Sequence, residues 1–474
     1  MAPPASPVAW IRRGLTLRVS PPASGVATSD RIQEGGRTYT VAVTTTQYET
    51  VPALAAEGQA HERDLVVMKF GGSSVADTDK IKGVARRLVA AREAGSRVVG
   101  VLSAMGDTTD ELIELAHQIS DRPHPREYDM LISVGERISN ALCAMAVHDL
   151  GHEAISLTGS QAGIVTDTVH GKAKIVDIRA QRIHDALAEE KIVLVAGFQG
   201  VSTTTHDVTT LGRGGSDTTA VALAAALGAE TCEIFTDVEG VFTADPRLVP
   251  DALKLASVTY EEMLEMAASG ARVMALRSVE FARSYGVKLR VRSTFGEGDG
   301  TWIGEEDPAM LEKAIISGVT HDTSEAKVSI LGVPDRPGVA ARTFRALADA
   351  GVNIDMIVQN VSEHGVTDIT FTLPKADLPI AEPILDRIAQ EIGAARVVQD
   401  PDIAKISLIG AGMKSHPGVA ADMFAALADA GINIEIISTS SIRISCVVRA
   451  AEVERAVRAV HDRFRVVVEE RVGG

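Results

Sequence analysis

The chain has 474 residues, a formal net charge of −16 at pH 7, 45% hydrophobic and 23% charged residues, a composition that excludes wholesale disorder. The length exceeds what one hydrophobic core serves and predicts two to four domains. The acidic balance argues against nucleic acid as a partner, and the absence of an apolar run of roughly 20 residues argues against a membrane span. Three dispersed cysteines, Cys143, Cys232 and Cys446, suggest neither a disulfide framework nor a zinc site and fit a cytoplasmic protein.

Residues 1–62 are rich in Pro, Ala, Ser and Thr and show no sustained periodicity, so we expect a disordered extension. Arg12, Arg13 and Arg18 resemble the basic residues of a transit peptide, but the apolar core of a secretory signal is missing. Both an upstream start and an untypical leader fit this stretch.

From Asp64 onward, short β-rich runs alternate with amphipathic segments, which predicts an α/β domain with a mainly parallel sheet. A strand at 65–68, a helix at 78–94 and a strand at 97–102 form a βαβ unit. The pattern predicts further strands at 192–196, 231–235 and 287–291, and helices at about 126–150 and at 221–227, the latter ending at Gly228.

After about residue 317 the chain repeats itself. Residues 337–357 and 417–437 share fifteen identical positions out of 21, which indicates an internal duplication. Each copy reads as a strand, a Pro-Gly loop, a helix (339–350 or 419–430) and a strand that begins at Asn353 or Asn433. We therefore expect two βαββαβ ferredoxin-like units.

Two glycine-rich joints between a strand and a helix suggest phosphate binding. At 69–74, glycines allow close backbone approach and Lys69 can supply charge, although a plain turn with a solvated lysine explains this segment about equally well, and a Walker-type loop is excluded. At 209–220, the N–H groups of a helix start attract an anion and Arg213 suits a carboxylate. An ordinary capped helix is the alternative there.

Three more segments are uninformative alone. Capping explains the turn at 103–110, the helical Glu136 is most simply a solvated residue, and 236–247 reads as two ordinary turns.

Together, KFGGSSV (69–75), SAMGDTTDEL (103–112), GERIS (135–139), GFQG (197–200), GRGGSDTTA (212–220) and TDVEGVFTADPR (236–247) resemble the amino-acid kinase family, and within it the aspartate kinases. The C-terminal repeats resemble two ACT domains. The resemblance implies a three-layer αβα kinase domain at 63–317, a first ACT domain at 318–400 and a second at 401–474.

The resemblance also implies roles for individual residues. Lys69 and Asp217 are expected to be catalytic, and Ser103, Thr109, Glu136 and Arg213 to bind aspartate, with Arg213 on the α-carboxylate and Glu136 on the ammonium. The nucleotide is expected at Lys69, Phe70, Gly71, Gly72, Gly214, Gly215, Ser216, Phe235, Thr236, Asp237, Val241, Phe242, Thr243, Ala244, Asp245, Pro246 and Arg272. Position 272 departs from the family pattern, because many relatives have Lys there. ATP is expected with Mg²⁺ held through phosphate oxygens rather than by dedicated protein ligands.

For the ACT pair, the resemblance implies that lysine, threonine or both bind where two such domains face each other. The matching residues are Asp335, Asn353, Ile354, Asp355 and Gln359 in the first unit, and Val419, Ala420, Asn433, Ile434, Ser440 and Ser441 in the second. Asn353 and Asn433 also suit tight turns. A homo-oligomer through the ACT domains is expected, and an internal start at Met310 would yield a shorter form as a partner.

The expected activity is phosphorylation of L-aspartate by ATP, the first step of lysine, threonine and methionine biosynthesis. Two alternatives stay open: a kinase of the same fold with another carboxylate, carbamate or UMP as acceptor, and an inactive amino-acid sensor.

Overall fold

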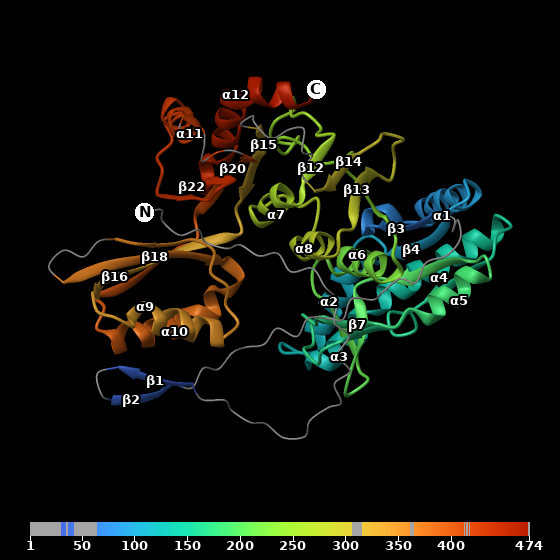
Figure 1. Ribbon diagram of the computed structural model, residues 1–474, viewed down its shortest axis with the longest axis horizontal. Helices are drawn as coiled ribbons and strands as arrows, with labels where there is room; N and C mark the ends of the chain where they lie inside the picture. The colour runs from blue at the N-terminus through green and yellow to red at the C-terminus, as the bar shows by residue number, and fades with distance from the viewer. Residues whose placement is uncertain are drawn as a thin grey trace, which may run out of the picture. The chain divides into compact units, whose positions relative to one another are not determined.

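The computed structural model describes residues 30–34, 37–41, 64–305, 315–360, 365–411, 413, 416 and 418–472 (Figure 1). The chain forms two compact units, 1–55 and 56–474. In the first, β1 (Asp30–Glu34) and β2 (Arg37–Val41) pair antiparallel, a hairpin that the expected disorder at 1–62 did not include. Alternating β-branched and aromatic residues in β2 favour a strand. The other residues of 1–62, which we expected to be disordered, lie outside the described residues, and so does Met310.

An eight-stranded sheet forms the middle layer of the kinase domain. Its neighbouring strands are parallel except for β13 and β14. The order is β12 (Ser257–Thr259), β14 (Thr301–Gly304), β13 (Lys288–Ser293), β11 (Thr231–Thr236), β3 (Leu65–Phe70), β4 (Arg97–Leu102), β8 (Ile192–Ala196) and β5 (Ala154–Leu157). The predicted strands are confirmed, with β13 shifted by one residue at its start.

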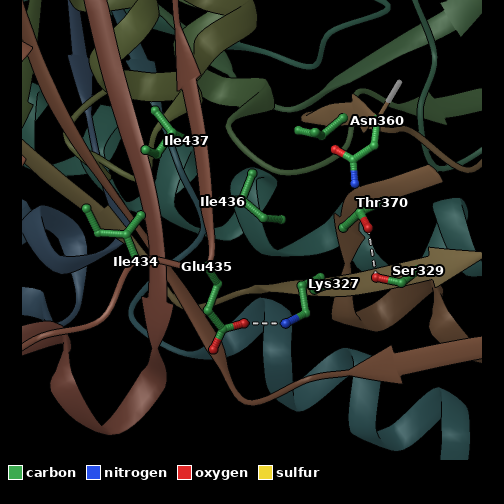
Figure 2. A pocket seen from close by; sticks show the side chains of 9 residues that line it. Lys327, Ser329, Asn360, Thr370, Ile434, Glu435, Ile436 and Ile437 are labelled. Carbon is green, nitrogen blue, oxygen red and sulfur yellow. Dashed lines mark hydrogen bonds and ion pairs between the residues drawn. The ribbon is translucent and has the colours of Figure 1, made fainter. Parts of the chain in front are cut away.

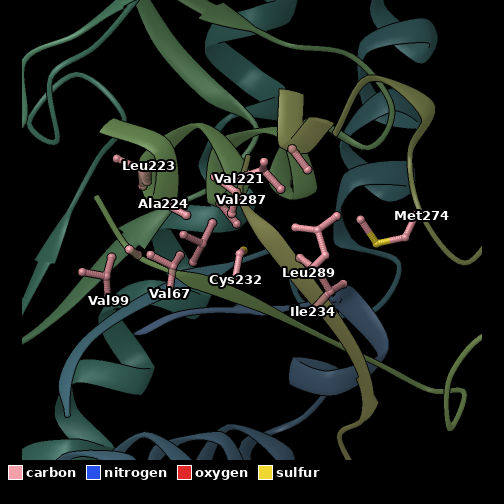
Figure 3. Close-up of a cluster of buried hydrophobic side chains, with 14 of the residues drawn as sticks. Val67, Val99, Val221, Leu223, Ala224, Cys232, Ile234, Met274, Val287 and Leu289 are labelled. Atoms are coloured by element: carbon pink, nitrogen blue, oxygen red, sulfur yellow. The ribbon is translucent and has the colours of Figure 1, made fainter. Parts of the chain in front are cut away.

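Helices cover both faces of this sheet. One face packs on α1 (Thr78–Glu93) and α4 (Val134–Asp149). The other packs on α5 (Gln181–Ala188), α6 (Gly215–Leu227), α7 (Tyr260–Ala268) and α8 (Leu276–Tyr285). Figure 3 shows strand residues Val67 and Val99 in one apolar cluster with Val221 and Leu223 of α6. The expected αβα layering is confirmed, because the strands are apolar on both faces and need a cover on each.

A smaller sheet lies beside this core, with the strand order β10 (Val208–Thr210), β9 (Gln199–Ser202), β6 (Ile164–Thr166) and β7 (Ile175–Ile178). The remaining helices of the domain are α2 (Thr108–Ile119) and α3 (Pro125–Ile132). We expected a single helix at 126–150, but the structure has two, because the helix is interrupted at Ser133 between α3 and α4. The carbonyl of Ser133 accepts a hydrogen bond from Gln199 Nε2 at 2.8 Å.

Residues Pro125–Asp149 are, by length and composition, long and apolar enough to cross a membrane. Half of that window is buried inside the protein, and the run carries the buried acids Asp129 and Glu136. It therefore reads as a core segment of the kinase domain.

The first repeat, residues 325–400, is a complete βαββαβ unit. Its strand order is β17 (Ile357–Gln359), β18 (Val366–Pro374), β16 (Glu325–Pro334) and β19 (Arg396–Asp400), and its helices are α9 (Val339–Asp349) and α10 (Leu378–Ile392). Figure 1 shows both helices on one face of this sheet. The strand expected from Asn353 begins later, at Ile357.

The second repeat comprises residues 403–472 together with one strand that precedes the first repeat in the sequence. It contains β20 (Ile403–Ala411), α11 (Gly418–Asp429), β21 (Ile436–Thr439), β22 (Arg443–Arg449) and α12 (Val453–Val472). The edge beside β20, which β19 fills in the first repeat, is filled by β15 (Ile315–Asp322), paired antiparallel. The expected boundary between residues 317 and 318 thus falls inside β15, and the first repeat is inserted into the second.

A buried ion pair joins the two repeats. Lys405 is fully buried, and its Nζ lies 2.5 Å from both Glu325 Oε1 and Asp355 Oδ2. Burial works against the charged lysine, yet the two carboxylates raise the pKa of its ammonium above the usual value. Burial also raises the pKa of Glu325. The charges compensate one another only while all three stay together.

We predict that Lys405→Met lowers the free energy of unfolding by about 3 kcal/mol, because it leaves buried carboxylates without their cation. Adding Glu325→Gln should recover part of that loss. Lys82→Met is the control, since Lys82 pairs with Asp79 only on the surface and should change stability by less than about 1 kcal/mol. Urea unfolding measures all three; equal effects for Lys405 and Lys82 would contradict the buried-pair account.

Candidate functional site

The predicted catalytic segments meet at the carboxyl ends of the central strands, where open parallel sheets bind ligands. Lys69 is the second-last residue of β3, Ser103 follows β4, and Phe235 is at the end of β11. Backbone hydrogen bonds hold these ends together, from Gly71 N to Phe235 O at 3.2 Å and from Ser103 N to Phe70 O at 3.0 Å. The chain segments at 69–74, 103–110 and 235–237 therefore share one edge of the sheet.

The second glycine joint lies against the first through an ion pair. Lys69 Nζ is 2.5 Å from Asp217 Oδ1, and each side chain is 11% exposed. Asp217 is in the first turn of α6, and its Oδ2 accepts a hydrogen bond from Ala275 N at 3.4 Å. The structure thus brings both predicted catalytic residues together at the positive end of a helix.

The glycines of these joints are required by close contacts. Gly214 has a φ of +71°, and a Cβ there would lie 2.2 Å from Ala275 Cβ. A Cβ on Gly72 would lie 3.1 Å from Ala104 O. Gly215 and Ser216 are buried at the start of α6. Because glycine has no side chain, an anion can come close to the backbone N–H groups at the start of this helix.

Glu136 is not the solvated helical residue that its segment alone suggested. It is 3% exposed in the first turn of α4, and its Oε1 accepts from Ala104 N at 3.3 Å. Its Oε2 is buried with no hydrogen-bond partner among the described residues. Burial raises the pKa of Glu136 to about 7. A buried carboxylate oxygen without a partner is suited to a cationic ligand.

The other two predicted aspartate-binding residues near Glu136 come from neighbouring segments. Ser103 carries the carbonyl that accepts from Ser139 Oγ at 2.7 Å, one turn after Glu136 on α4. Thr109 is in the first turn of α2. Arg213 is exposed just before α6, and its guanidinium makes no ion pair within the described part of the chain.

The segment predicted to bind the nucleotide divides into two parts. Phe235 is buried and stacked on Phe70, with ring centroids 4.8 Å apart, so neither aromatic ring is open to a ligand. Thr236, Asp237 and Phe242 keep accessible surface, as do Asp245, Pro246, Arg247 and Arg272.

The second part of this segment packs on the second repeat. Thr243 is fully buried: its Oγ1 lies 3.1 Å from His461 Nε2 of α12, and its carbonyl accepts from Val319 N of β15 at 2.7 Å. Val241 and Ala244 are both buried. Ala244 belongs to the apolar core of the second repeat. The side chains of Thr243 and Ala244 are thus used in packing, a role that the sequence did not indicate.

The predicted effector residues lie in both repeats. Asp335, Asn353 and Ile354 flank α9, Gln359 ends β17, and Asp355 is ion-paired with Lys405. In the second repeat, Val419 and Ala420 begin α11, Asn433 and Ile434 follow it, and Ser441 follows β21. Ser440 Oγ donates to Glu265 of α7, at 3.4 Å.

A pocket of about 370 Å³ lies between the two repeats, and only Ile434 of the predicted effector residues lines it. The other lining residues are Lys327, Ser329, Val358, Asn360, Thr370, Glu435, Ile436 and Ile437. Figure 2 shows the Lys327–Glu435 ion pair and the Ser329–Thr370 hydrogen bond in its wall.

Some residues that organise the site were not predicted. Asp129 and Arg277 hold the segment before Arg213 in place. An acid or arginine inside an amphipathic helix gives no sequence signal of burial, so pattern reasoning could not find them. Among the described residues no group of three or more His, Cys, Asp or Glu side chains could hold a metal ion.

Comparison with known proteins agrees with this geometry. A model of the amino acid kinase family matches residues 64–293, and models of the ACT domain match 328–393 and 406–464. The aspartokinase of Mycolicibacterium smegmatis is 58% identical over 403 residues, which are 84% of this chain and 96% of that protein. The aspartokinase of Corynebacterium glutamicum is 56% identical over 405 residues, 85% of this chain and 96% of that one.

Solved structures give the same result for the fold. The Escherichia coli aspartokinase III complex with aspartate and ADP matches with a TM-score of 0.75 at 24% identity, over 85% of this chain and all of that one. The complex of that enzyme with lysine and aspartate matches with a TM-score of 0.64 at 25% identity, over 84% of this chain and 99% of that one. The chain therefore belongs to the amino acid kinase family and is one of its aspartate kinases, with two ACT domains after the kinase domain.

Proposed function

We propose that this chain transfers the γ-phosphoryl group of ATP to the side-chain carboxylate of L-aspartate, giving 4-phospho-L-aspartate and ADP. The observation that carries the proposal is the Lys69–Asp217 ion pair, which joins two glycine-rich joints at the carboxyl edge of the sheet. The solved aspartokinase with aspartate and ADP supports both ligands.

The chemistry needs positioning and charge more than proton transfer. The attacking carboxylate is ionised at neutral pH, so no general base is required. Its oxygen forms the new bond to the γ-phosphorus while the bond to the bridging oxygen breaks and ADP leaves with that electron pair. In this proposal Lys69 neutralises charge on the transferred group, and Asp217, which is ion-paired with Lys69, holds its ammonium in place.

The substrate is recognised at its two charged ends. Arg213, which is exposed and unpaired among the described residues, binds the α-carboxylate, and the free Oε2 of Glu136 accepts from the ammonium. Ser103 and Thr109 complete this subsite. An acceptor without an ammonium, such as carbamate or UMP, would not need an acid at this place.

The nucleotide lies over the glycines of both joints and the accessible residues of 236–247, with Arg272 nearby. Mg²⁺ would accompany ATP and shield its phosphates through their own oxygens. In this arrangement no protein cage is required around the metal ion.

We further propose that lysine, threonine or both inhibit at the ACT domains, that the protein forms a homo-oligomer through them, and that it serves lysine, threonine and methionine biosynthesis in the cytoplasm. The lysine-bound structure of aspartokinase III supports an amino-acid effector. A shorter polypeptide starting at Met310 would be an additional partner.

ADP release with Mg-ATP tests the proposal, with L-aspartate or glutamate as acceptor, and with lysine, threonine or both added. Release that requires aspartate and is suppressed by the amino acids supports it. Release only with another acceptor refutes the substrate, and binding of lysine or threonine without turnover supports the sensor alternative.

We predict that Lys69→Ala reduces kcat by at least roughly a hundredfold, because a charge acting in a dry site is lost. Lys82→Ala is the control, since that side chain is 62% exposed on α1 and should leave kcat unchanged. Steady-state ADP release measures both. Near-wild-type turnover in Lys69→Ala would remove this residue from the mechanism.

Glu136 predicts a pH dependence. Its carboxyl has a pKa of about 7 in the folded protein, so kcat/KM for aspartate should fall as pH drops below 7, where the ammonium loses its anionic partner. Glu136→Gln should have a low kcat/KM without this limb. Glu127→Gln, whose side chain is 66% exposed on α3, should keep the wild-type profile.

The same group predicts a stability change of known sign. Because folding raises this pKa above the usual value of 4.5, the folded state holds the proton more tightly, and stability falls as pH rises from 4.5 to 7. Glu136→Gln should therefore raise the melting temperature at pH 8 more than at pH 5. An equal shift at both pH values would show that Glu136 is not buried as a titrating acid.

A further inference from the structure

Asp129, on α3, is a fully buried acid outside the predicted site. Four donors surround its carboxylate: His170 Nδ1 at 2.7 Å, Gly171 N at 3.1 Å, Thr210 N at 3.1 Å and Thr210 Oγ1 at 2.6 Å. A buried charge with this many hydrogen bonds fixes the segments that supply them.

Those segments are the loop before β7 and the end of β10. Thr210 is the last residue of β10, an edge strand that pairs with β9 alone among the strands that the structure describes. Its outward N–H would lack a strand partner, and Asp129 accepts from it instead. The carboxylate thus takes the place of a neighbouring strand at this edge.

The chain beyond Thr210 is held from a second side. Arg277 of α8 donates to Leu211 O at 3.2 Å and to Ala173 O at 3.0 Å. Ala173 N donates to Thr210 O at 2.9 Å. With residues 210 and 211 fixed in this way, the next side chain outside the packed region is Arg213.

The helix that carries Asp129 also comes within electrostatic range of Arg213. Burial raises the pKa of Tyr128, the residue before Asp129, and the positive charge of Arg213 opposes that rise. Glu136 follows on α4, seven residues further along the chain. One run of chain therefore carries both the acid proposed for the substrate ammonium and the acid that braces the Arg213 segment.

We propose that Asp129 is a positioning residue: through Thr210 it sets Arg213 at the distance from Glu136 that matches the α-carboxylate and ammonium of aspartate. This inference rests on the proposed function, because it requires Arg213 to bind the α-carboxylate.

The test is Asp129→Asn, which keeps the shape of the side chain but turns an amide N–H₂ toward at least one donor. KM for aspartate should rise by roughly tenfold to a hundredfold, as expected for a misplaced binding group, while KM for ATP changes by less than about twofold. Thr210→Val, which removes only the 2.6 Å bond, should give a smaller change of the same kind.

A second readout separates positioning from general damage. The α-carboxamide of aspartate lacks the charge that Arg213 binds, so the wild type should prefer aspartate to it by roughly tenfold or more. Asp129→Asn and Arg213→Ala should both reduce this preference. Asp167→Asn is the matched control: Asp167 accepts from Val169 N and Lys174 N in the same loop but does not bond Thr210.

The outcomes are distinct. If Arg213→Ala weakens aspartate selectively but Asp129→Asn and Thr210→Val do not, the positioning role is wrong and the proposed function stands. If Arg213→Ala affects both substrates equally, the role of Arg213 fails, and this inference fails with it. If Asp129→Asn lowers the melting temperature and raises both KM values alike, Asp129 is structural only.

Discussion

The Lys69–Asp217 ion pair is the contact on which the rest of the proposed active site depends. Lys69 comes from β3 and Asp217 from α6, and their pairing places the two glycine joints on either side of one space. Lys69 is nearly buried, so an unpaired ammonium there would carry a large desolvation cost. Asp217 therefore both stabilises the lysine and fixes its direction. The positive N-terminal end of α6, where Asp217 lies, in turn favours the negative charge of this acid.

The second repeat lies between this site and the first repeat in the chain of contacts. Its strand β15 and helix α12 bond Thr243, within the segment proposed for the nucleotide. Arg443 is 3.1 Å from Glu265 of α7. The Lys405 pair then joins the second repeat to Asp355 of the first. Packed contacts therefore run from Asp355, a residue expected to bind the effector, to the segment proposed for the nucleotide.

Much of this was predictable from sequence because it depends on local pattern. Alternating apolar runs predicted the strands, Gly228 predicted the end of α6, and the near-identity of 337–357 with 417–437 predicted two copies of one unit. The motifs around Lys69, Glu136 and Arg213 predicted the candidate site residues. Their roles as substrate and nucleotide ligands stay predictions, since they rest on resemblance rather than on a bound ligand.

The sequence by itself thus determined the element types, the duplication and the family, because periodicity and short motifs are written in neighbouring residues. The tertiary structure alone decided that β15 completes the second repeat, that Thr243 faces α12, and that Asp129 and Lys405 are buried. Each of these depends on residues distant in sequence, and a charged side chain looks the same in the sequence whether solvent or a buried partner surrounds it.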